Sequence, residues 1–310
     1  MQQHAIEFPM ELLPSRRGGA VAFVRPAVRA LRPHQWVKNA LVPVPLLLAH
    51  RLPWDHPDPL GDPLWQWARA VAAVAAFCLA ASAIYLVNDL RDLEADRAHP
   101  TKRRRPFASG ALPTAFGLPM VASLMAAMAG ICALLPPRFA LVLGLYVSLS
   151  LAYALWLKRK LLVDVFVLAG LYTLRLLAGG EAAGVGISRW LLAFSIFFFV
   201  SLAFAKRYSE LQLMAAEGRT KASGRNYTLD DLRVIEGAGP ASGYLAVLVL
   251  ALYINDASGA AGRLYAEPFF LWLLCPLLMY WVSRVWFLAG RQMLDDDPIL
   301  FAVRDKVSWW

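Results

Sequence analysis

The most polar stretch of the chain, residues 88–110, carries three oxygen-bearing side chains one helical turn apart. Asn88, Asp92 and Asp96 follow an i, i+4, i+8 spacing, which places all three on one face of a helix. Carboxylate and amide oxygens suit Mg²⁺, which keeps several waters and completes its coordination shell with substrate phosphates. The spacing therefore predicts a magnesium site that holds a phosphorylated substrate.

A histidine and a run of cations follow this face. His99 returns to it at i+11, Pro100 then ends the helix, and residues 102–105 are four consecutive cations that can pair with phosphates. Cytoplasmic loops are often basic, but they rarely also carry three oxygen ligands in register, so we interpret the segment as a binding site. His99 either binds phosphate or packs at the helix end. The charged residues off this face, expected to be solvated or structural, are Asp89, Arg91 and Glu94.

Membrane helices must position these residues. Of the 310 residues, 59% are hydrophobic and only 17% are charged, so the chain is not an ordinary soluble domain. No alternating strand pattern is present, and each crossing takes roughly 20 helical residues. Pro43 and Pro45 are expected to kink the first crossing. We predict eight transmembrane helices, at residues 36–52, 70–87, 111–137, 139–157, 161–183, 190–205, 237–254 and 266–290.

The loops between these spans divide the cations unevenly. One side holds 24 of the 31 Lys and Arg residues and the other side holds 4, the positive-inside pattern of membrane proteins. Topology thus explains the net charge of +9 without nucleic-acid binding. We expect an inner (cytoplasmic) membrane protein with both termini in the cytoplasm and the lipid bilayer as a partner; assembly into a homo-oligomer is left open. Its predicted parts are a basic cytoplasmic or interfacial segment (1–35), a transmembrane catalytic bundle (36–290) and a cytoplasmic tail (291–310).

Residues 88–106 resemble the signature of a known family. The run NDLRDLEAD matches the Asn-Asp-x-x-Asp-x-x-x-Asp motif of the UbiA superfamily of intramembrane prenyltransferases, and HPTKRRRP matches the run that follows it. The resemblance implies an all-α, UbiA-like bundle of eight or nine transmembrane helices with a cytoplasm-facing active-site cavity. It also implies that Asn88, Asp92 and Asp96 bind Mg²⁺ and a diphosphate leaving group.

The chain departs from the general superfamily pattern after the sixth span. A second Asp-rich motif is usual there, whereas this chain reads FAKRYSELQL, with no aspartate before Asp230 and Asp231. That run, together with residues 32–39 (RPHQWVKN), resembles the decaprenyl-phosphate phosphoribosyltransferase branch. Further similarity lies in residues 161–180, in residues 226–228 and in Asp305. The branch ends in a ninth membrane helix, and because this sequence stops at Trp310, we expect either a truncated chain or a bundle that closes differently.

The resemblance implies transfer of 5-phosphoribose from phosphoribosyl pyrophosphate to a polyprenyl phosphate, with release of pyrophosphate, towards lipid-linked arabinose. The residues suit this chemistry, because carboxylates can hold a metal-bound diphosphate, cations can hold the 5-phosphate, and an anionic acceptor needs no strong base. The predicted catalytic residues are Asn88, Asp92, Asp96 and Asp164. The predicted substrate-binding residues are Gln35, Lys38, Asn39, His99, Lys102, Arg105, Arg175, Lys206, Arg207, Tyr208, Glu210 and Tyr227.

Alternatives stay open at this point. An enzyme of the same fold could move a prenyl chain from prenyl diphosphate to an aromatic or other acceptor, if Asp230 and Asp231 replaced the missing motif. A transporter or lipid-binding subunit also tolerates charges in membrane helices, but it seldom displays a metal-and-phosphate face. Two predicted site residues have structural alternatives, namely an ion pair of Lys206 with Glu210 and a buried ion pair of Arg175 with Glu181 or with another helix.

Overall fold

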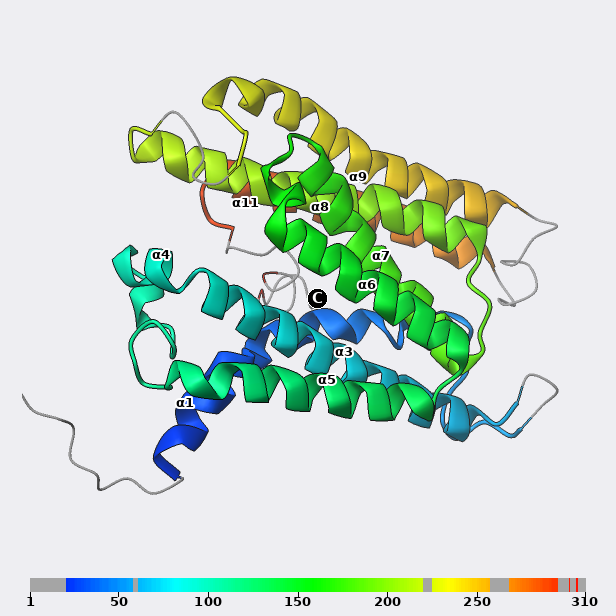
Figure 1. Cartoon of the computed structure of the whole chain (residues 1–310). Coiled ribbons are helices and arrows are strands. Elements are labelled where there is room, and N and C mark those ends of the chain that lie inside the picture. The colour runs from blue at the N-terminus through cyan, green and yellow to red at the C-terminus, as the bar shows by residue number, and fades with distance from the viewer. Residues whose placement is uncertain are drawn as a thin grey trace, which may run out of the picture.

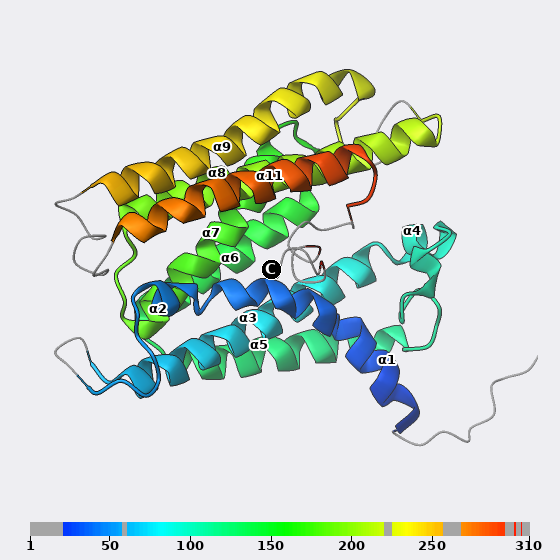
Figure 2. The same ribbon diagram turned by 180° about the vertical axis from the view of Figure 1, so that it is seen from behind.

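The chain folds into a bundle of long helices that run side by side (Figures 1 and 2). The structure, a computed structural model, describes residues 21–57, 61–219, 225–256 and 268–294, together with residues 301 and 305. Within this part of the chain, seven helical segments are long and apolar enough to cross a membrane. The protein is therefore a multi-pass membrane protein, as the composition predicts.

The seven segments contain α3 (Pro63–Arg91), α5 (Gly117–Ala133), α6 (Pro137–Leu155), α7 (Val163–Ala183), α8 (Arg189–Ala216), α9 (Leu232–Asn255) and α11 (Leu274–Gly290). The shorter α-helices are α1 (Val21–Leu31), α2 (Val44–Leu48) and α4 (Leu93–Ala98). The 3-10 helices are η1 (Pro33–Leu41), η2 (Lys102–Arg104), η3 (Thr114–Phe116), η4 (Leu157–Arg159), η5 (Leu229–Asp231) and η6 (Pro268–Leu273).

Helix α7 joins two packed cores. On one side its Ala178 packs with Phe77 of α3 and Phe139 of α6. On the other side its Leu176 packs with Phe199 of α8, in a core that also reaches α11. In lipid, close packing of this kind holds helices together, because the hydrophobic effect no longer drives their association. Helix α7 is accordingly the most buried of the seven spans, and charged residues on it lie inside the protein.

The first predicted span, residues 36–52, is not one kinked α-helix. Its residues form the 3-10 helix η1 and the five-residue helix α2, with a turn between them at residues 42–43. Pro43 and Pro45 lack the amide hydrogens that a continuous α-helix requires, which accounts for the break. Within the described residues, the number of long helices is therefore seven rather than eight.

This broken segment nevertheless runs along the length of α3. Arg32 contacts Asp89 near one end of α3, and Arg51 Nε donates to Gln66 Oε1 at the other end, at 3.0 Å. From residue 66 to residue 89 α3 rises about 34 Å. The shorter stretch from Arg32 to Arg51 covers a similar length only if it rises more per residue than an α-helix, as a 3-10 helix does.

Only parts of the two end segments belong to the described residues. Residues 1–20 of the predicted interfacial segment lie outside the described residues. Helix α1 exposes Phe23 and Val24 beside Arg25 and Arg29, which suits a membrane surface. At the other end, most of the predicted tail lies outside the described residues. The tail's Asp305 accepts hydrogen bonds from Arg284 of α11 at 2.6 and 3.1 Å.

Candidate functional site

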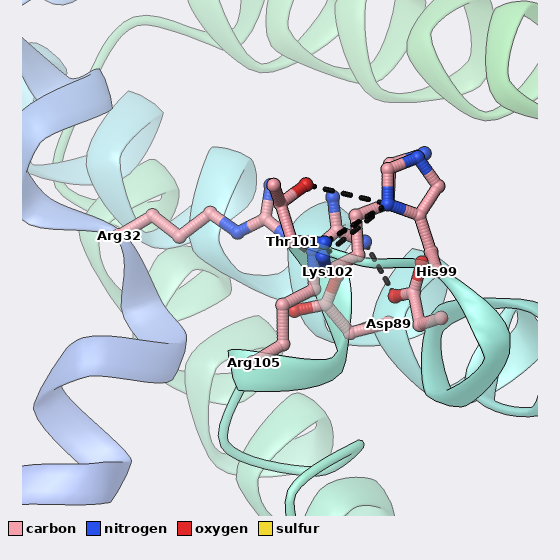
Figure 3. Close-up of polar contacts among 7 residues, drawn as sticks. Arg32, Asp89, His99, Thr101, Lys102 and Arg105 are labelled. Carbon is pink, nitrogen blue, oxygen red and sulfur yellow. Dashed lines mark hydrogen bonds and ion pairs between the residues drawn. The ribbon is translucent and has the colours of Figure 1, made fainter.

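A buried carboxylate, Asp89, organises the end of α3. Arg32 Nη2 lies 2.5 Å and Arg105 Nη1 lies 3.1 Å from its Oδ1 atom, and only 2% of Asp89 is exposed. Arg105 Nη1 also lies 2.5 Å from Asp96 Oδ2, so this side chain bridges two carboxylates. Figure 3 shows Arg32 and Arg105 converging on Asp89 from different parts of the chain. Because a buried charge requires a partner, these pairs hold both arginines against α3.

The predicted helical face is interrupted at its centre. Helix α3 ends at Arg91, and Asp92 leaves the helical conformation before α4 begins. The amides of Asp92 and Asp96 still donate to the carbonyls four residues earlier, at 2.9 and 2.8 Å, so the turn spacing is kept. The side chains differ, however. Asp96 is buried and bound by Arg105, whereas Asn88 and Asp92 are half-buried and form no side-chain hydrogen bond or ion pair within the described residues.

His99 shapes the turn that follows α4. Its Nδ1 atom accepts hydrogen bonds from the backbone amides of Thr101 and Lys102, at 3.3 and 3.5 Å (Figure 3). The ring is exposed, and it fixes the backbone from which Lys102 projects. His99 therefore sits at the helix end in a structural position, and its role in phosphate binding stays a prediction.

A second buried carboxylate, Asp164, lies in the first turn of α7. Tyr227 Oη donates to its Oδ1 at 2.6 Å, and Arg207 Nε of α8 lies 3.3 Å from its Oδ2. Asp164 is fully buried, and Arg207 is only 1% exposed. Three predicted site residues that are far apart in the sequence thus meet at one centre. The sequence motifs pointed to each of these residues, but they did not predict that the residues pair.

Glu210 and Arg225 extend the Asp164 centre outward. Glu210 pairs with Arg207 and lies 3.1 Å from Arg225 Nη1. Burial lowers the pKa of Arg225, but Glu210, Tyr153 and Asp164 raise it by more, so the net shift is upward. Burial, together with the hydrogen bond to Asp164, raises the pKa of Tyr227. Two arginines and a neutral tyrosine therefore surround the acidic groups at neutral pH.

Charges from both carboxylate sites act on Lys158 of η4. Burial lowers its pKa, the Asp92 carboxylate offsets part of this effect, and the charges of Arg91 and Arg225 add to the lowering. Arg91 also donates to the carbonyl of Ala154 at 3.3 Å, which ties the end of α3 to the end of α6. Lys158 is therefore within electrostatic range of Asp92 at the end of α3 and of Arg225 beside the Asp164 centre, and we call these groups together the polar region.

Arg175 occupies a separate polar site on α7. Its Nε donates to Asn39 Oδ1 at 3.1 Å, its Nη2 to Tyr146 Oη at 2.9 Å, and its Nη1 to the carbonyl of Leu171 at 2.7 Å. Within the described residues Arg175 forms no ion pair with Glu181 or with another helix, and the groups that hold it are neutral. The site holds a buried cation whose described partners are all neutral.

Tyr208 belongs to a different group of side chains from its neighbour Arg207. Its hydroxyl donates to Glu236 Oε1 at 2.7 Å, and its ring lies 5.7 Å from that of Trp286. These contacts join α8 to α9 and α11. A role for Tyr208 in substrate binding stays a prediction.

Three further predicted residues are half-buried at the edges of these sites. Gln35 accepts a hydrogen bond from Tyr85 at 3.5 Å, Lys38 lies in η1 one residue before the buried Asn39, and Lys206 lies on α8. Their proposed contacts with substrate remain predictions.

Sequence reasoning missed four residues of these sites: Arg32, Asp89, Lys158 and Arg225. Asp89 stands inside the recognised motif, but its position off the helical face suggested a solvated or structural residue. In the structure Asp89 is deeply buried and has the structural role of the two. Arg225 directly precedes residues 226–228, which drew attention only through their resemblance. Neither residue could be paired with its partner without the fold.

Residues 58–307 match the UbiA prenyltransferase family. The chain belongs to this family. The membership confirms the resemblance read from the motif at residues 88–96, and it accounts for the all-helical bundle. A solved UbiA homolog from Archaeoglobus fulgidus, bound to GPP and Mg²⁺, has the same fold, with a TM-score of 0.66 and 15% identity over 89% of this chain and 93% of that one.

Relatives of higher identity carry different names. The nodulation protein NoeC of Azorhizobium caulinodans is 39% identical over 90% of this chain and 87% of NoeC. The decaprenyl-phosphate phosphoribosyltransferase of Mycobacterium tuberculosis (strain H37Rv) is 35% identical over 90% of this chain and 88% of that enzyme. The uncharacterized protein y4nM of Sinorhizobium fredii is 38% identical over 90% of this chain, which spans only 52% of y4nM, about half its length.

Proposed function

We propose that this UbiA-family protein transfers 5-phosphoribose from phosphoribosyl pyrophosphate to a polyprenyl phosphate of the decaprenyl type. Pyrophosphate leaves, and the product serves lipid-linked arabinose and other cell-envelope glycan precursors. The name and identity of the mycobacterial relative support this assignment. The observation that supports this assignment most directly is the Asp164 centre. Arg207 and Tyr227 bind the Asp164 carboxylate there, and cations stand after the sixth predicted span, where a second acidic cluster is usual in the superfamily.

This arrangement matches a donor with two unlike anionic ends. The end of α3 offers the free oxygens of Asn88 and Asp92, which suit a metal-bound diphosphate. The opposite side of the polar region offers Arg207 and Arg225, which suit a phosphate without a metal. A prenyl diphosphate has only one anionic end and would leave these arginines unused.

The reaction needs positioning and charge stabilisation rather than a strong base. An oxygen of the polyprenyl phosphate forms a bond to C1 of the ribose, the bond from C1 to the pyrophosphate oxygen breaks, and the bonding electrons leave with pyrophosphate. The acceptor is already an anion, so no proton has to be removed. Positive charge that develops on the ribose is stabilised by nearby carboxylates, and arginines stabilise the phosphates. Preorganised, buried groups such as Arg207 are suited to this role.

A divalent metal fits the end of α3 with two ligands in place. No group of three His, Cys, Asp or Glu side chains within the described ranges could hold a metal unaided. Mg²⁺, however, commonly takes one or two protein oxygens and obtains the rest from water and substrate. Asn88 and Asp92 would hold it, and Asp96 would join them only if Arg105 released its carboxylate. The bound ion would neutralise the diphosphate and make it a better leaving group.

The structure disfavours the prenyltransferase alternative at one point. That alternative needs Asp230 and Asp231 to act as a second acidic cluster. The Asp231 carboxylate instead accepts hydrogen bonds from the amide and hydroxyl of Thr228, at 2.8 and 3.3 Å, in a capping box at the start of η5. One oxygen of the Asp231 carboxylate, Oδ2, is thus already occupied by the helix cap.

A two-donor transfer assay tests the proposed function. Purified protein is given decaprenyl phosphate and either ribose-labelled phosphoribosyl pyrophosphate or labelled prenyl diphosphate with a small aromatic acceptor, each with Mg²⁺ or with EDTA. We expect lipid-bound label from phosphoribosyl pyrophosphate only, and only with Mg²⁺. Asp92→Asn should abolish transfer without changing the melting temperature, while the exposed neighbour Glu94→Gln serves as the matched control. Label transferred from prenyl diphosphate instead would contradict the proposal.

We also propose that the cation-rich end faces the cytoplasm in the inner membrane, with both termini on that side. The distribution of 24 cations against 4 supports this orientation. A thiol-specific, membrane-impermeant label should reach Ser109→Cys only after the membrane is opened, and His56→Cys in intact spheroplasts. The opposite labelling pattern would invert the topology. The division at residues 35 and 290 and the assembly into a homo-oligomer stay predictions.

A further inference from the structure

A pocket of about 260 Å³ lies beside the motif, between α1, the end of α3 and the loop after α4. It is lined by five cations, Arg29, Arg32, Lys102, Arg104 and Arg105, and by a single carboxylate, Asp89. The pocket is thus strongly basic, and two of its arginines, Arg29 and Arg104, have no part in the site described above.

The cations of the pocket fall into two groups. Arg32 and Arg105 are paired with Asp89, and Arg105 is also paired with Asp96. These pairs fix two walls of the pocket and leave it without a free carboxylate. The remaining three cations, which form no ion pair within the described residues, are Arg29, Lys102 and Arg104. Three unpaired like charges around one hollow repel one another, and an anion placed between them removes that repulsion.

A metal ion is not what this pocket suits. Its only carboxylate is buried: two guanidinium groups contact the Oδ1 atom, and the Oδ2 atom, which has no hydrogen-bond partner among the described residues, is not accessible from the pocket. Guanidinium groups instead match the oxygens of a phosphate with paired, charge-assisted hydrogen bonds. Because two of the unpaired cations come from η2 and one from α1, a phosphate here would also bind these two elements together.

We propose that this pocket binds an anionic phosphate group without a metal, through Arg29, Lys102 and Arg104. The ligand has two candidate sources, the 5-phosphate of the donor and the headgroup phosphate of an anionic lipid. The first source rests on the proposed function and would place the 5-phosphate here instead of at Arg207 and Arg225. The second follows from α1, whose exposed Phe23 and Val24 would place the pocket at the membrane surface. Both sources present anionic phosphate oxygens to the same cations, as a monoester in ribose 5-phosphate and as a diester in phosphatidylglycerol.

The test measures binding in EDTA, so that metal-dependent binding does not contribute. Full-length protein is placed in nanodiscs of zwitterionic lipid and titrated with ribose 5-phosphate by calorimetry. Arg29→Gln and Arg104→Gln should each weaken binding about tenfold or more, since a hydrogen bond to a charged group is lost. The matched controls are Arg25→Gln on α1 and Arg103→Gln on η2, whose exposed side chains do not line the pocket.

A second arm separates the two sources. The same variants are purified from nanodiscs that contain phosphatidylglycerol, and the retained lipid is measured by native mass spectrometry. Loss of ribose 5-phosphate binding in the pocket variants alone assigns the pocket to a soluble phosphate. Loss of retained phosphatidylglycerol alone assigns it to a lipid headgroup. If both arms are unchanged, or if the control variants lose as much as the pocket variants, the pocket is not a phosphate site, whatever the transfer assay shows.

Discussion

The Asp164–Arg207 pair yields a quantitative expectation for stability. Asp164 is fully buried and Arg207 is 1% exposed, so neither charge can turn to water when its partner is removed. After Arg207→Met, the Asp164 carboxylate keeps the hydroxyl of Tyr227 as its side-chain partner. Breaking a buried ion pair from one side typically costs about 3–5 kcal/mol. We therefore expect Arg207→Met to lower the free energy of unfolding by about 4 kcal/mol.

Replacing both partners should cost less than replacing one. In the double variant Asp164→Asn with Arg207→Met, no unpaired carboxylate is left in the interior, and the amide oxygen that takes the place of the carboxylate can still accept from Tyr227. The double variant should therefore lose only about 1–2 kcal/mol, which is less than the single Arg207→Met variant. Such non-additivity is the signature of two buried charges that are each other's partner.

Unfolding in a mixed-micelle titration with SDS, followed by tryptophan fluorescence, measures these free energies. The matched control is the exposed pair of Glu217 and Arg219, whose side chains are 50% and 52% exposed. Its cycle, Glu217→Gln with Arg219→Met, should show a coupling below about 1 kcal/mol. If the Asp164–Arg207 cycle is as additive as this exposed pair, the argument from burial is refuted.

Three further outcomes follow from the same structure. Because the pKa of Tyr227 is raised in the folded protein, unfolding releases a proton once the pH exceeds about 10, so stability falls as the pH rises from there. The melting temperature should therefore fall more steeply at alkaline pH for the wild type than for Tyr227→Phe. Parallel curves would count against the raised pKa. A Cβ at Gly179 would lie 1.7 Å from the Val42 carbonyl oxygen, whereas a Cβ at Gly144 would meet open space. Gly179→Ala should therefore lower the melting temperature and Gly144→Ala should not. Equal melting temperatures would mean that the broken segment at residues 36–52 does not pack on α7. Arg175 is a buried cation with neutral described partners, so Arg175→Met should keep the melting temperature while reducing the transfer of 5-phosphoribose. A large fall in melting temperature with full activity would make Arg175 a purely structural residue.

Local patterns in the sequence predict much of the fold. Uninterrupted apolar runs mark the long helices, because a membrane crossing depends mainly on length and composition. The segment at residues 36–52 shows the limit of this reasoning. Its hydropathy is that of a span, but Pro43 and Pro45 break the helix instead of bending it. The prolines indicate that the helix is disturbed, but whether it bends or breaks depends on how tightly the segment packs against α3 and α7.

The sequence singled out part of the candidate site as residues, but it did not show which of them pair. The motif drew attention to Asp92 and Asp96 as equivalent ligands, yet of these two Arg105 binds Asp96 and leaves Asp92 open. Asp89 meets Arg32 across 57 positions of sequence, and Asp164 meets Tyr227 across 63. Periodicity carries no information over such separations, because these contacts depend on the packing of whole helices.

Mass spectrometry of the lipid product tests the central claim most directly. Purified protein is incubated with Mg²⁺, decaprenyl phosphate, a small aromatic acceptor, phosphoribosyl pyrophosphate and prenyl diphosphate together, and all products are identified by intact mass. The proposed function predicts one new lipid, decaprenyl phosphate that carries a single phosphoribosyl group, and its absence with Asp92→Asn. A prenylated acceptor, with decaprenyl phosphate left unchanged, would contradict it.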